Sequence, residues 1–351
     1  MHVDLVTKTG YIAEEHEVIT EDGYYLLLHR ISGGPQNPVR PGKPVVLLLH
    51  GLMGASDIWV LRGPRYDIAY QLVDNGFDVW ALNVRGNFYC KRHRNYSDKD
   101  VKFWQFSWHE IGFYDLPASI DYILSLTQQS KISLIGYSMG ATEEFVLLST
   151  RPKYNTKVNV ALAWAPVVIV THELPGLFIN FMLRYGNQLE KVFQFFNFFE
   201  LFPRLSTKQL NTAEFWLKLC WNRSVQSLCH RLMDFIFGVN NLNIDLPTLK
   251  RFWSHYPQGT SIRTIIHYGQ IVLRRKFTQY DFGSDENHRK YNNVEPAEYP
   301  IENISTPLII YHSSGDDITN KQVLAINKFI HVLIKDIITL RSNHLLIILG
   351  R

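Results

Sequence analysis

Residues 131–145 read KISLIGYSMGATEEF. A short apolar run, residues 132–135, enters the turn GYSMG at residues 136–140, and a helix-compatible segment leaves it. This strand, turn and helix carry the pattern G-x-S-x-G, which is typical of a nucleophile elbow. Side chains two positions before and after the serine would clash in so tight a turn, and glycine occupies both positions. We therefore predict that Ser138 presents its hydroxyl at the end of a strand, where the N–H of Met139 can donate to an oxyanion.

The composition is that of an ordinary globular protein. With 351 residues, 46% hydrophobic and 19% charged, the chain can bury a large core, and we expect one sizeable domain with an insertion. The net charge is +4 without a long basic run, so nothing supports nucleic-acid binding. The nearest candidate for a transmembrane segment, residues 192–202 (VFQFFNFFELF), is too short and is interrupted by polar residues. The first ten residues, MHVDLVTKTG, lack an apolar stretch, so we expect no secretory signal in the chain as given.

The patterning on both sides of the turn predicts a mainly parallel sheet with helices on both faces. Residues 11–31 alternate polar and apolar around Asp22-Gly23, as in an antiparallel hairpin. Residues 45–49 form a continuous apolar run, as in a strand buried on both faces. We expect further strands over residues 78–82, 132–135, 158–165, 307–311 and 337–340, and helices over 67–74, 114–127, 139–150 and 320–332. Strands and helices that alternate in this way are typical of α/β proteins.

The alternation fades after Pro166, where aromatic residues become frequent. We interpret this region as a mainly helical cap inserted into the sheet domain. The predicted organisation is a first part of the core in residues 1–166, a cap or lid in residues 167–294 and a second part of the core in residues 295–351.

A serine hydroxyl is a poor nucleophile at neutral pH, so Ser138 needs a base within hydrogen-bonding reach and an acid that orients the base. In folds with this elbow the acid and then the histidine follow the nucleophile, each after a strand. Asp316 follows the first of the two late strands, and the adjacent Asp317 is the competing candidate. His344 follows the second. We therefore predict Ser138, Asp316 and His344 as a catalytic triad.

The turn HGLMG, residues 50–54, follows the buried strand at residues 45–49. This architecture places its second oxyanion donor there, and we assign that donor to the N–H of Leu52. His50 is interpreted as structural, because the base is expected late in the chain.

Other polar residues receive structural interpretations. Asp115 is predicted to cap a helix, and Glu143 and Glu144 are predicted to lie in the first turn of the elbow helix, where negative charge suits the helix dipole. No group of His, Cys and carboxylate residues has zinc-site spacing, so we predict no metal and no cofactor.

Segments along nearly the whole chain resemble the acid lipases, the family of gastric lipase, lysosomal acid lipase and insect digestive lipases. The segments are, in order, GYIAEEHEVITEDGYYL, LLLHGLMGASDIWV, NVRGNFY, SWHEIGFYDLPASIDYIL, IGYSMGATEEFVLLSTRPKYN, HYPQGTSIRTIIHYGQ, YHSSGDDIT and NHL. The resemblance implies an α/β-hydrolase fold with a helical cap and lid, together with the triad and oxyanion donors named above. It also implies a disulfide between Cys220 and Cys229, which leaves Cys90 unpaired.

The resemblance further implies a serine ester hydrolase that cleaves neutral lipid esters, either triacylglycerol or cholesteryl ester, at a lipid–water interface. The chain departs from the family at Leu346, where an aspartate is usual, and at Ser313 and Ser314, where glycines are common. These departures motivate an alternative, a catalytically impaired relative that binds lipid. A third interpretation is an acyltransferase or thioesterase that uses the same triad.

Sequons for N-glycosylation occur at Asn95, Asn222 and Asn303. Together with the implied disulfide, which needs an oxidising compartment, they favour a secreted protein or one of the lysosomal lumen. We expect a monomer. Because members of the family carry a signal peptide and a further carboxyl-terminal helix, we expect the chain as given to be an incomplete or shortened form.

Overall fold

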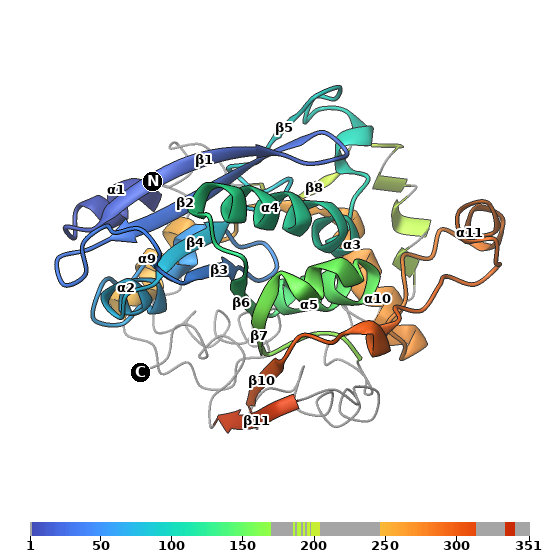
Figure 1. Cartoon of the computed structure of the whole chain (residues 1–351). Coiled ribbons are helices and arrows are strands. Elements are labelled where there is room, and N and C mark those ends of the chain that lie inside the picture. Colours follow the sequence, from blue (N-terminus) through green and yellow to red (C-terminus); the bar gives the residue numbers. More distant parts are fainter. Residues whose placement is uncertain are drawn as a thin grey trace.

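The computed structural model describes residues 2–169, 185–186, 188–190, 192–193, 195–196, 198–203, 246–313 and 334–340. Within these residues one sheet contains nine strands in the order β1-β2-β4-β3-β6-β7-β10-β11, with β5 paired to β2 (Figure 1). The strands are β1 (Ile12–Ile19), β2 (Tyr24–Gly33), β3 (Val45–Leu49), β4 (Asp78–Leu82), β5 (Arg92–His93), β6 (Ile132–Tyr137), β7 (Val158–Trp164), β10 (Leu308–Ser313) and β11 (Ile334–Leu340).

Helices lie before, between and beyond these strands. In the core they are α1 (His2–Thr7), α2 (Ile68–Asp74), α3 (Trp108–Glu110), the π-helical turn η3 (Ile111–Asp115), α4 (Leu116–Thr127) and α5 (Met139–Thr150), with short 3-10 turns at η1 (Ser56–Trp59), η2 (Val101–Trp104), η4 (Pro152–Thr156) and η5 (Ile301–Asn303). In the region predicted as a cap they are α9 (Leu246–His255), α10 (Ile262–Arg274) and α11 (Ser284–Tyr291).

The strands from β4 to β11 along the sheet are all parallel to their neighbours, and the amino-terminal hairpin β1–β2 joins them antiparallel through β4. The register aligns their carboxyl ends. Leu49 at the end of β3 pairs with Gly136 in β6, and Tyr137 at the end of β6 pairs with Trp164 in β7. The carboxyl ends of β3, β6, β10 and β11 therefore lie at one edge of the sheet, where open α/β sheets bind ligands.

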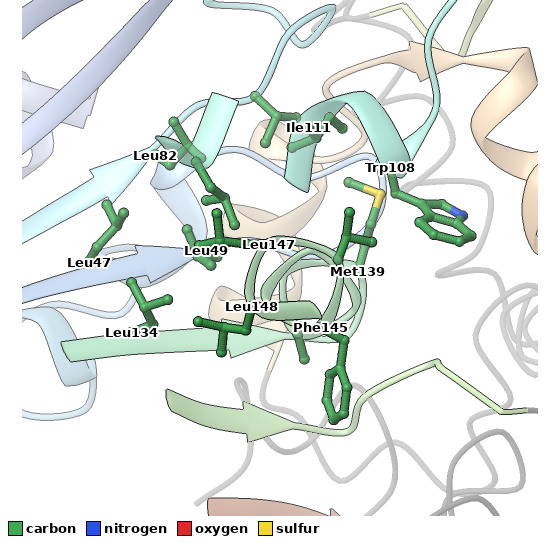
Figure 2. Close-up of a cluster of buried hydrophobic side chains, with 14 of the residues drawn as sticks. Leu47, Leu49, Leu82, Trp108, Ile111, Leu134, Met139, Phe145, Leu147 and Leu148 are labelled. Carbon is green, nitrogen blue, oxygen red and sulfur yellow. The ribbon is translucent and has the colours of Figure 1, made fainter. Parts of the chain in front are cut away.

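The side chains of β3 alternate between two apolar layers, because successive residues of a strand point to opposite faces. Leu47 and Leu49 pack in the layer that contains α4 and α5, whereas Val46 and Leu48 pack in the layer that contains α1 and α2. Figure 2 shows the first layer, with Leu47, Leu49 and Leu134 from the sheet facing Leu147 and Leu148 of α5. All five residues of β3 are buried, which confirms the prediction of a strand covered on both faces.

The order of elements follows the prediction closely. The hairpin around Gly23, the strand at 78–82 and the elbow strand and helix are confirmed, and the predicted helix at 114–127 is α4 preceded by the π-helical turn η3. The predicted helix at 320–332 lies outside the described residues. One short antiparallel pair, β8 (Glu200–Leu201) with β9 (Thr260–Ser261), was not predicted, since strands of two residues leave no periodic pattern.

The described part of the cap region packs directly on the core. The ring of His267 in α10 stacks on Trp108 of α3, with centroids 3.7 Å apart and planes at 12°. The hydroxyl of Ser261 donates to the carbonyl oxygen of Trp104 at 2.6 Å. These contacts join residues about 160 positions apart in the chain.

Candidate active site

Ser138 lies between β6 and α5 in a strained conformation. Its φ is +54° and its ψ is −109°, values that are uncommon for a residue with a side chain. The N–H of Ser138 donates to the carbonyl oxygen of Trp164 at 2.8 Å, and its own carbonyl accepts from the N–H of Thr142 at 3.1 Å, which begins the helix. The serine is 9% exposed at the carboxyl edge of the sheet. This is the geometry expected of a nucleophile elbow.

The two glycines of the pattern are required by close backbone contacts. A Cβ atom at Gly136 would lie 2.6 Å from the amide nitrogen of Ala141. At Gly140 it would lie 2.4 Å from the carbonyl oxygen of Leu49, at the end of β3. Contacts below 3.0 Å with backbone atoms cannot be relieved by moving a side chain, so the steric argument made from the sequence holds at both positions.

The HGLMG turn lies against the elbow. A Cβ atom at Gly51 would be 3.3 Å from the Cβ of Ser138 and 3.0 Å from the ring of Tyr137. Leu52, the residue assigned as the second oxyanion donor, therefore follows a glycine that touches the candidate nucleophile. Met139, the other assigned donor, begins α5 and is 1% exposed.

His50 is buried and holds this turn in place. Its Nδ1 lies 2.8 Å from the carbonyl oxygen of Gly51, and a carbonyl can only accept, so Nδ1 carries the proton. Nε2 is then an acceptor, and it lies 3.4 Å from the Nδ2 of Asn87. Burial lowers the pKa of His50 to about 4, which keeps the ring neutral. These contacts agree with the structural interpretation of His50.

The NVRGNFY segment carries a buried ion-pair network. Arg85 is 1% exposed, and its guanidinium donates to Asp115 at 2.6 and 2.8 Å and to Asp22 at 2.5 and 2.8 Å. The prediction that Asp115 caps a helix is wrong, because its side chain makes no capping hydrogen bond and instead accepts from the side chain and backbone of Arg85. The pairing joins positions 30 residues apart, which a local pattern does not reveal.

The prediction for Glu143 and Glu144 is also wrong. Both side chains are fully buried, and the first turn of α5 contains no acidic residue. Burial raises the pKa of each carboxyl well above 4.5, which disfavours the charged form that would interact with the helix dipole. An almost entirely buried helix left no amphipathic pattern from which their burial could be recognised.

A second buried polar cluster, around Asp57, was not predicted. Asp57 accepts from the hydroxyl of Tyr89 at 2.8 Å, and its other oxygen lies 2.9 Å from Nδ1 of His255, which is 198 residues away. Burial alone would raise the pKa of Asp57, but the hydrogen bond and charge of His255 outweigh it and hold the pKa below 3.8. The only signal in the sequence is that Asp57 lies within LLLHGLMGASDIWV and His255 at the start of HYPQGTSIRTIIHYGQ.

Several predicted residues lie outside the described part of the chain. They are Asp316, Asp317, His344, Leu346, Cys220, Cys229 and Asn222. Of the other two sequons, Asn95 and Asn303 are both exposed. Cys90 is a buried free thiol.

The described residues lack two further features. They contain no group of three or more His, Cys, Asp or Glu side chains arranged to hold a metal ion. None of the helices in the described ranges is long and apolar enough to cross a membrane.

Two family models match the chain. A model of the partial alpha/beta-hydrolase lipase region matches residues 2–63, and a model of the alpha/beta hydrolase fold matches residues 44–349. Among solved structures, a Sulfolobus solfataricus protein described as a candidate lipase superposes with a TM-score of 0.60 at 15% identity, covering 93% of this chain and 85% of that chain. This similarity confirms the predicted fold class.

Curated relatives are more similar in sequence. Lipase 1 of Drosophila melanogaster is 35% identical over 89% of this chain, which spans 66% of that protein, slightly less than two thirds of its length. Human gastric triacylglycerol lipase and human lipase member N are each 33% identical, over 91% and 92% of this chain and 78% and 79% of their own. The resemblance seen in the sequence is confirmed by these matches along almost the whole chain. The chain therefore belongs to the lipases of the α/β-hydrolase family.

Proposed function

We propose that this chain hydrolyses ester bonds of neutral lipids through an acyl-enzyme formed on Ser138. The observation that carries the proposal is the strained elbow. Ser138 has a φ of +54°, and the backbone around Gly136 and Gly140 leaves no room for a side chain at either glycine. Such strain persists only where the surrounding structure imposes it, and it is concentrated at functional sites. The proposed substrate class follows relatives such as the human gastric triacylglycerol lipase.

The strand register supports the proposed acid and base. β10 ends at Ser313, three residues before Asp316, and β11 ends at Leu340, four residues before His344. Within the sheet β10 is two strands from β6, and β11 is three. Because neighbouring strands are about 4.8 Å apart, the carboxyl ends of β10 and β11 lie about 10 to 15 Å from β6 across the sheet. Both strand ends lie at the same edge of the sheet as Ser138.

The proposed mechanism has two halves. His344 takes the proton of Ser138 as its Oγ attacks the acyl carbonyl, and Asp316 holds the imidazole and stabilises its charged form. The N–H groups of Leu52 and Met139 bind the oxyanion of the tetrahedral intermediate. Collapse of this intermediate breaks the ester C–O bond, and His344 gives the proton to the leaving alcohol. Water then attacks the acyl-enzyme with His344 again as base, which releases the fatty acid and restores Ser138.

An exposed aromatic segment of the cap region, the described residues between Glu190 and Glu200, supports a lipid substrate. Phe195 is 81% exposed and Phe196 is 72% exposed, which is unusual for phenylalanine. Ion pairs hold both ends of the segment: Glu190 lies 2.7 Å from Arg263, and Glu200 lies 2.6 Å from Lys91. We propose that this segment contacts the lipid surface.

Several features of the proposed enzyme follow the sequence analysis. We propose that residues 167–294 form the cap or lid between core parts 1–166 and 295–351. Exposure of Asn95 and Asn303 supports glycosylation, and with it a protein of the secretory route, either secreted or lysosomal. We further propose a monomer that binds no nucleic acid and uses no cofactor.

The test is covalent labelling and turnover. An alkyl phosphonate should label the wild type at one site, and Ser138→Ala should remove the label and lower hydrolysis of a short-chain aryl ester by at least about 10³-fold. Ser130→Ala is the matched control, because Ser130 is exposed before the elbow strand and should leave both measurements unchanged. Equal labelling of the wild type and Ser138→Ala would end the assignment of the nucleophile.

Substrate and reaction class are tested with a panel. Triacylglycerol, cholesteryl ester and a short aryl ester are supplied at acidic and neutral pH, with and without an acceptor alcohol. Hydrolysis of long-chain ester that depends on Ser138 is expected. Turnover no greater than that of Ser138→Ala, with lipid still bound, would instead support a lipid-binding relative.

A further inference from the structure

Three consecutive carbonyl groups shape the turn that is proposed to supply an oxyanion donor. They belong to Gly51, Leu52 and Met53, and each accepts a hydrogen bond. The carbonyl oxygen of Gly51 accepts from the N–H of Gly54 at 3.0 Å and from Nδ1 of His50 at 2.8 Å. Because a peptide group is planar, a donor that holds one residue's carbonyl also sets the direction of the next residue's N–H.

The other two carbonyls are held from the cap region. The hydroxyl of Tyr256 donates to the carbonyl oxygen of Leu52 at 3.2 Å, and the backbone N–H of Gln258 donates to that of Met53 at 2.8 Å. Both donors belong to residues 255–258, which start at the last residue of α9, and we name this segment the cap clamp. Met53 has a φ of +55°, in the left-handed region that is disfavoured for residues with a side chain. The turn therefore depends on outside support for its shape.

The cap clamp is anchored on the same loop by Asp57. The carboxylate of Asp57 is fully buried, with Oδ2 2.9 Å from Nδ1 of His255 and 3.3 Å from Nε2 of Gln258. Gln258 is also fully buried, and its Nε2 donates to the carbonyl oxygen of His255 at 2.5 Å. Polar groups buried to this extent are costly to move, so the loop and the clamp hold each other in one arrangement.

We propose that the cap clamp positions the oxyanion turn for catalysis. The N–H of Leu52 shares a peptide plane with the carbonyl of Gly51, which accepts from the N–H of Gly54, and that N–H in turn shares a plane with the carbonyl of Met53, which accepts from Gln258. Tyr256 fixes the remaining peptide of the turn, between Leu52 and Met53, and is therefore a positioning residue. The inference rests on the proposed function, because it gives Tyr256 a part in the same reaction. Tyr256 acts through the carbonyl of Leu52 rather than on the reacting atoms. An oxyanion donor accelerates the reaction when it already points to the place where negative charge develops. Loosening the turn should therefore reduce stabilisation of the transition state more than it reduces substrate binding.

The test is Tyr256→Phe, which removes only the hydroxyl and keeps the ring that stacks on Phe252 at 4.8 Å. We expect kcat for a short-chain aryl ester to fall roughly fivefold to tenfold, the effect of losing about one hydrogen bond in the transition state, while KM changes less than about twofold. The matched control is Tyr291→Phe, because that hydroxyl also donates to a backbone carbonyl of the cap region, that of Tyr280 at 2.8 Å. Its kcat should equal that of the wild type.

Phosphonate labelling of Ser138 provides a second measurement, since the phosphonate oxygen occupies the place of the oxyanion. Tyr256→Phe should slow labelling by the same factor as kcat. If it does not fold, Gln258→Leu takes its place, because it keeps the backbone N–H and volume but loses the contact with Asp57. That variant should show the same selective loss of kcat.

The outcomes separate the two proposals. Unchanged kcat and labelling in a folded Tyr256→Phe, while Ser138→Ala is inactive, would overturn the role of the cap clamp and leave the proposed function standing. A rise in KM alone, with kcat unchanged, would also overturn the proposed role of the cap clamp. If the wild type shows no turnover that depends on Ser138, the proposed function fails and the inference fails with it.

Discussion

Glu143 is a single residue with a large energetic consequence. Its side chain is fully buried in α5, and neither carboxyl oxygen has a hydrogen-bond partner in the structure described here. Burial raises its pKa well above 4.5, with Asp115 and Glu144 adding to the shift. The folded state therefore keeps a proton that the unfolded state releases above pH 4.5. Folding stability must fall as the pH rises from 4.5 towards the pKa of the folded state.

We expect Glu143→Gln to remove this dependence. The free energy of unfolding of the variant should match the wild type near pH 4.5 and exceed it at higher pH, by up to about 1.4 kcal/mol for each pH unit below the folded pKa. Urea denaturation at pH 5 and pH 8 measures the difference. Glu302→Gln, at an exposed position, is the control and should change neither value. If the difference in the free energy of unfolding between wild type and variant is the same at pH 5 and pH 8, the raised pKa of Glu143 is contradicted.

Residues were predictable where their roles depend on local backbone geometry. Gly136, Ser138 and Gly140 act within one turn, so five letters of sequence were enough to assign their conformation and packing. Asp115 and Glu143 were misassigned because their surroundings come from distant segments: the partner of Asp115 is Arg85, on the loop after β4. Charge alone does not tell a solvated carboxylate from a buried one.

Among the elements, the loop after β4 depends on Arg85. Its guanidinium is 1% exposed, donates to Asp22 and Asp115, and lies 4.0 Å from the ring centre of Tyr24. It thus connects the hairpin β1–β2 to the start of α4. Removing one partner of a buried pair leaves the other charges without compensation.

We expect Arg85→Ala to lower the free energy of unfolding by about 3–5 kcal/mol at neutral pH. Chemical denaturation followed by tryptophan fluorescence measures the loss. Lys276→Ala is the control, since its ion pair with Glu298 is 59% exposed on both sides and should contribute less than about 1 kcal/mol. Equal losses in the two variants would show that burial of Arg85 adds nothing.

Elements with a clear hydrophobic period were predicted, and those defined by tertiary contacts were not. β3 and β4 are short apolar runs, and their bounds follow from the sequence. The pair β8–β9 and the cap clamp at residues 255–258 have no period, since each exists through hydrogen bonds to a partner more than 50 residues away. The site was therefore predictable up to the turn, but its support from the cap region was not.

At the scale of the whole molecule, neutral histidines are buried in several layers of the core. Burial lowers the pKa of His2 to about 3 and the pKa values of His29 and His50 to about 4. The rings of His2 and His29 are stacked, with their centroids 4.4 Å apart. The unfolded chain protonates these rings below about pH 6.5 and the folded chain does not. The stability that these three rings contribute is therefore complete above pH 6.5 and is lost as the pH falls towards 4.

We expect acid unfolding with a slope of up to about 4 kcal/mol per pH unit between pH 6 and pH 4, if three rings take up protons together. His2→Leu should reduce the slope by about 1.4 kcal/mol per pH unit. His288→Gln, at an exposed position of α11, should leave it unchanged. The measurement is the free energy of unfolding at half-unit steps of pH, and a slope that His2→Leu does not alter would count against this account.

The central and outer strands of the sheet carry different parts of the proposed chemistry. β3 and β6, in the middle, present the turn and the serine, whereas β10 and β11 lie at one border and lead to the residues proposed to move protons. A chain without those two strands would lack the proposed acid and base, and it would also lose Leu308 and Ile310 from its buried core. Turnover and packing therefore share the same border of the sheet, so a deletion that abolished the proposed chemistry would also remove part of the interior.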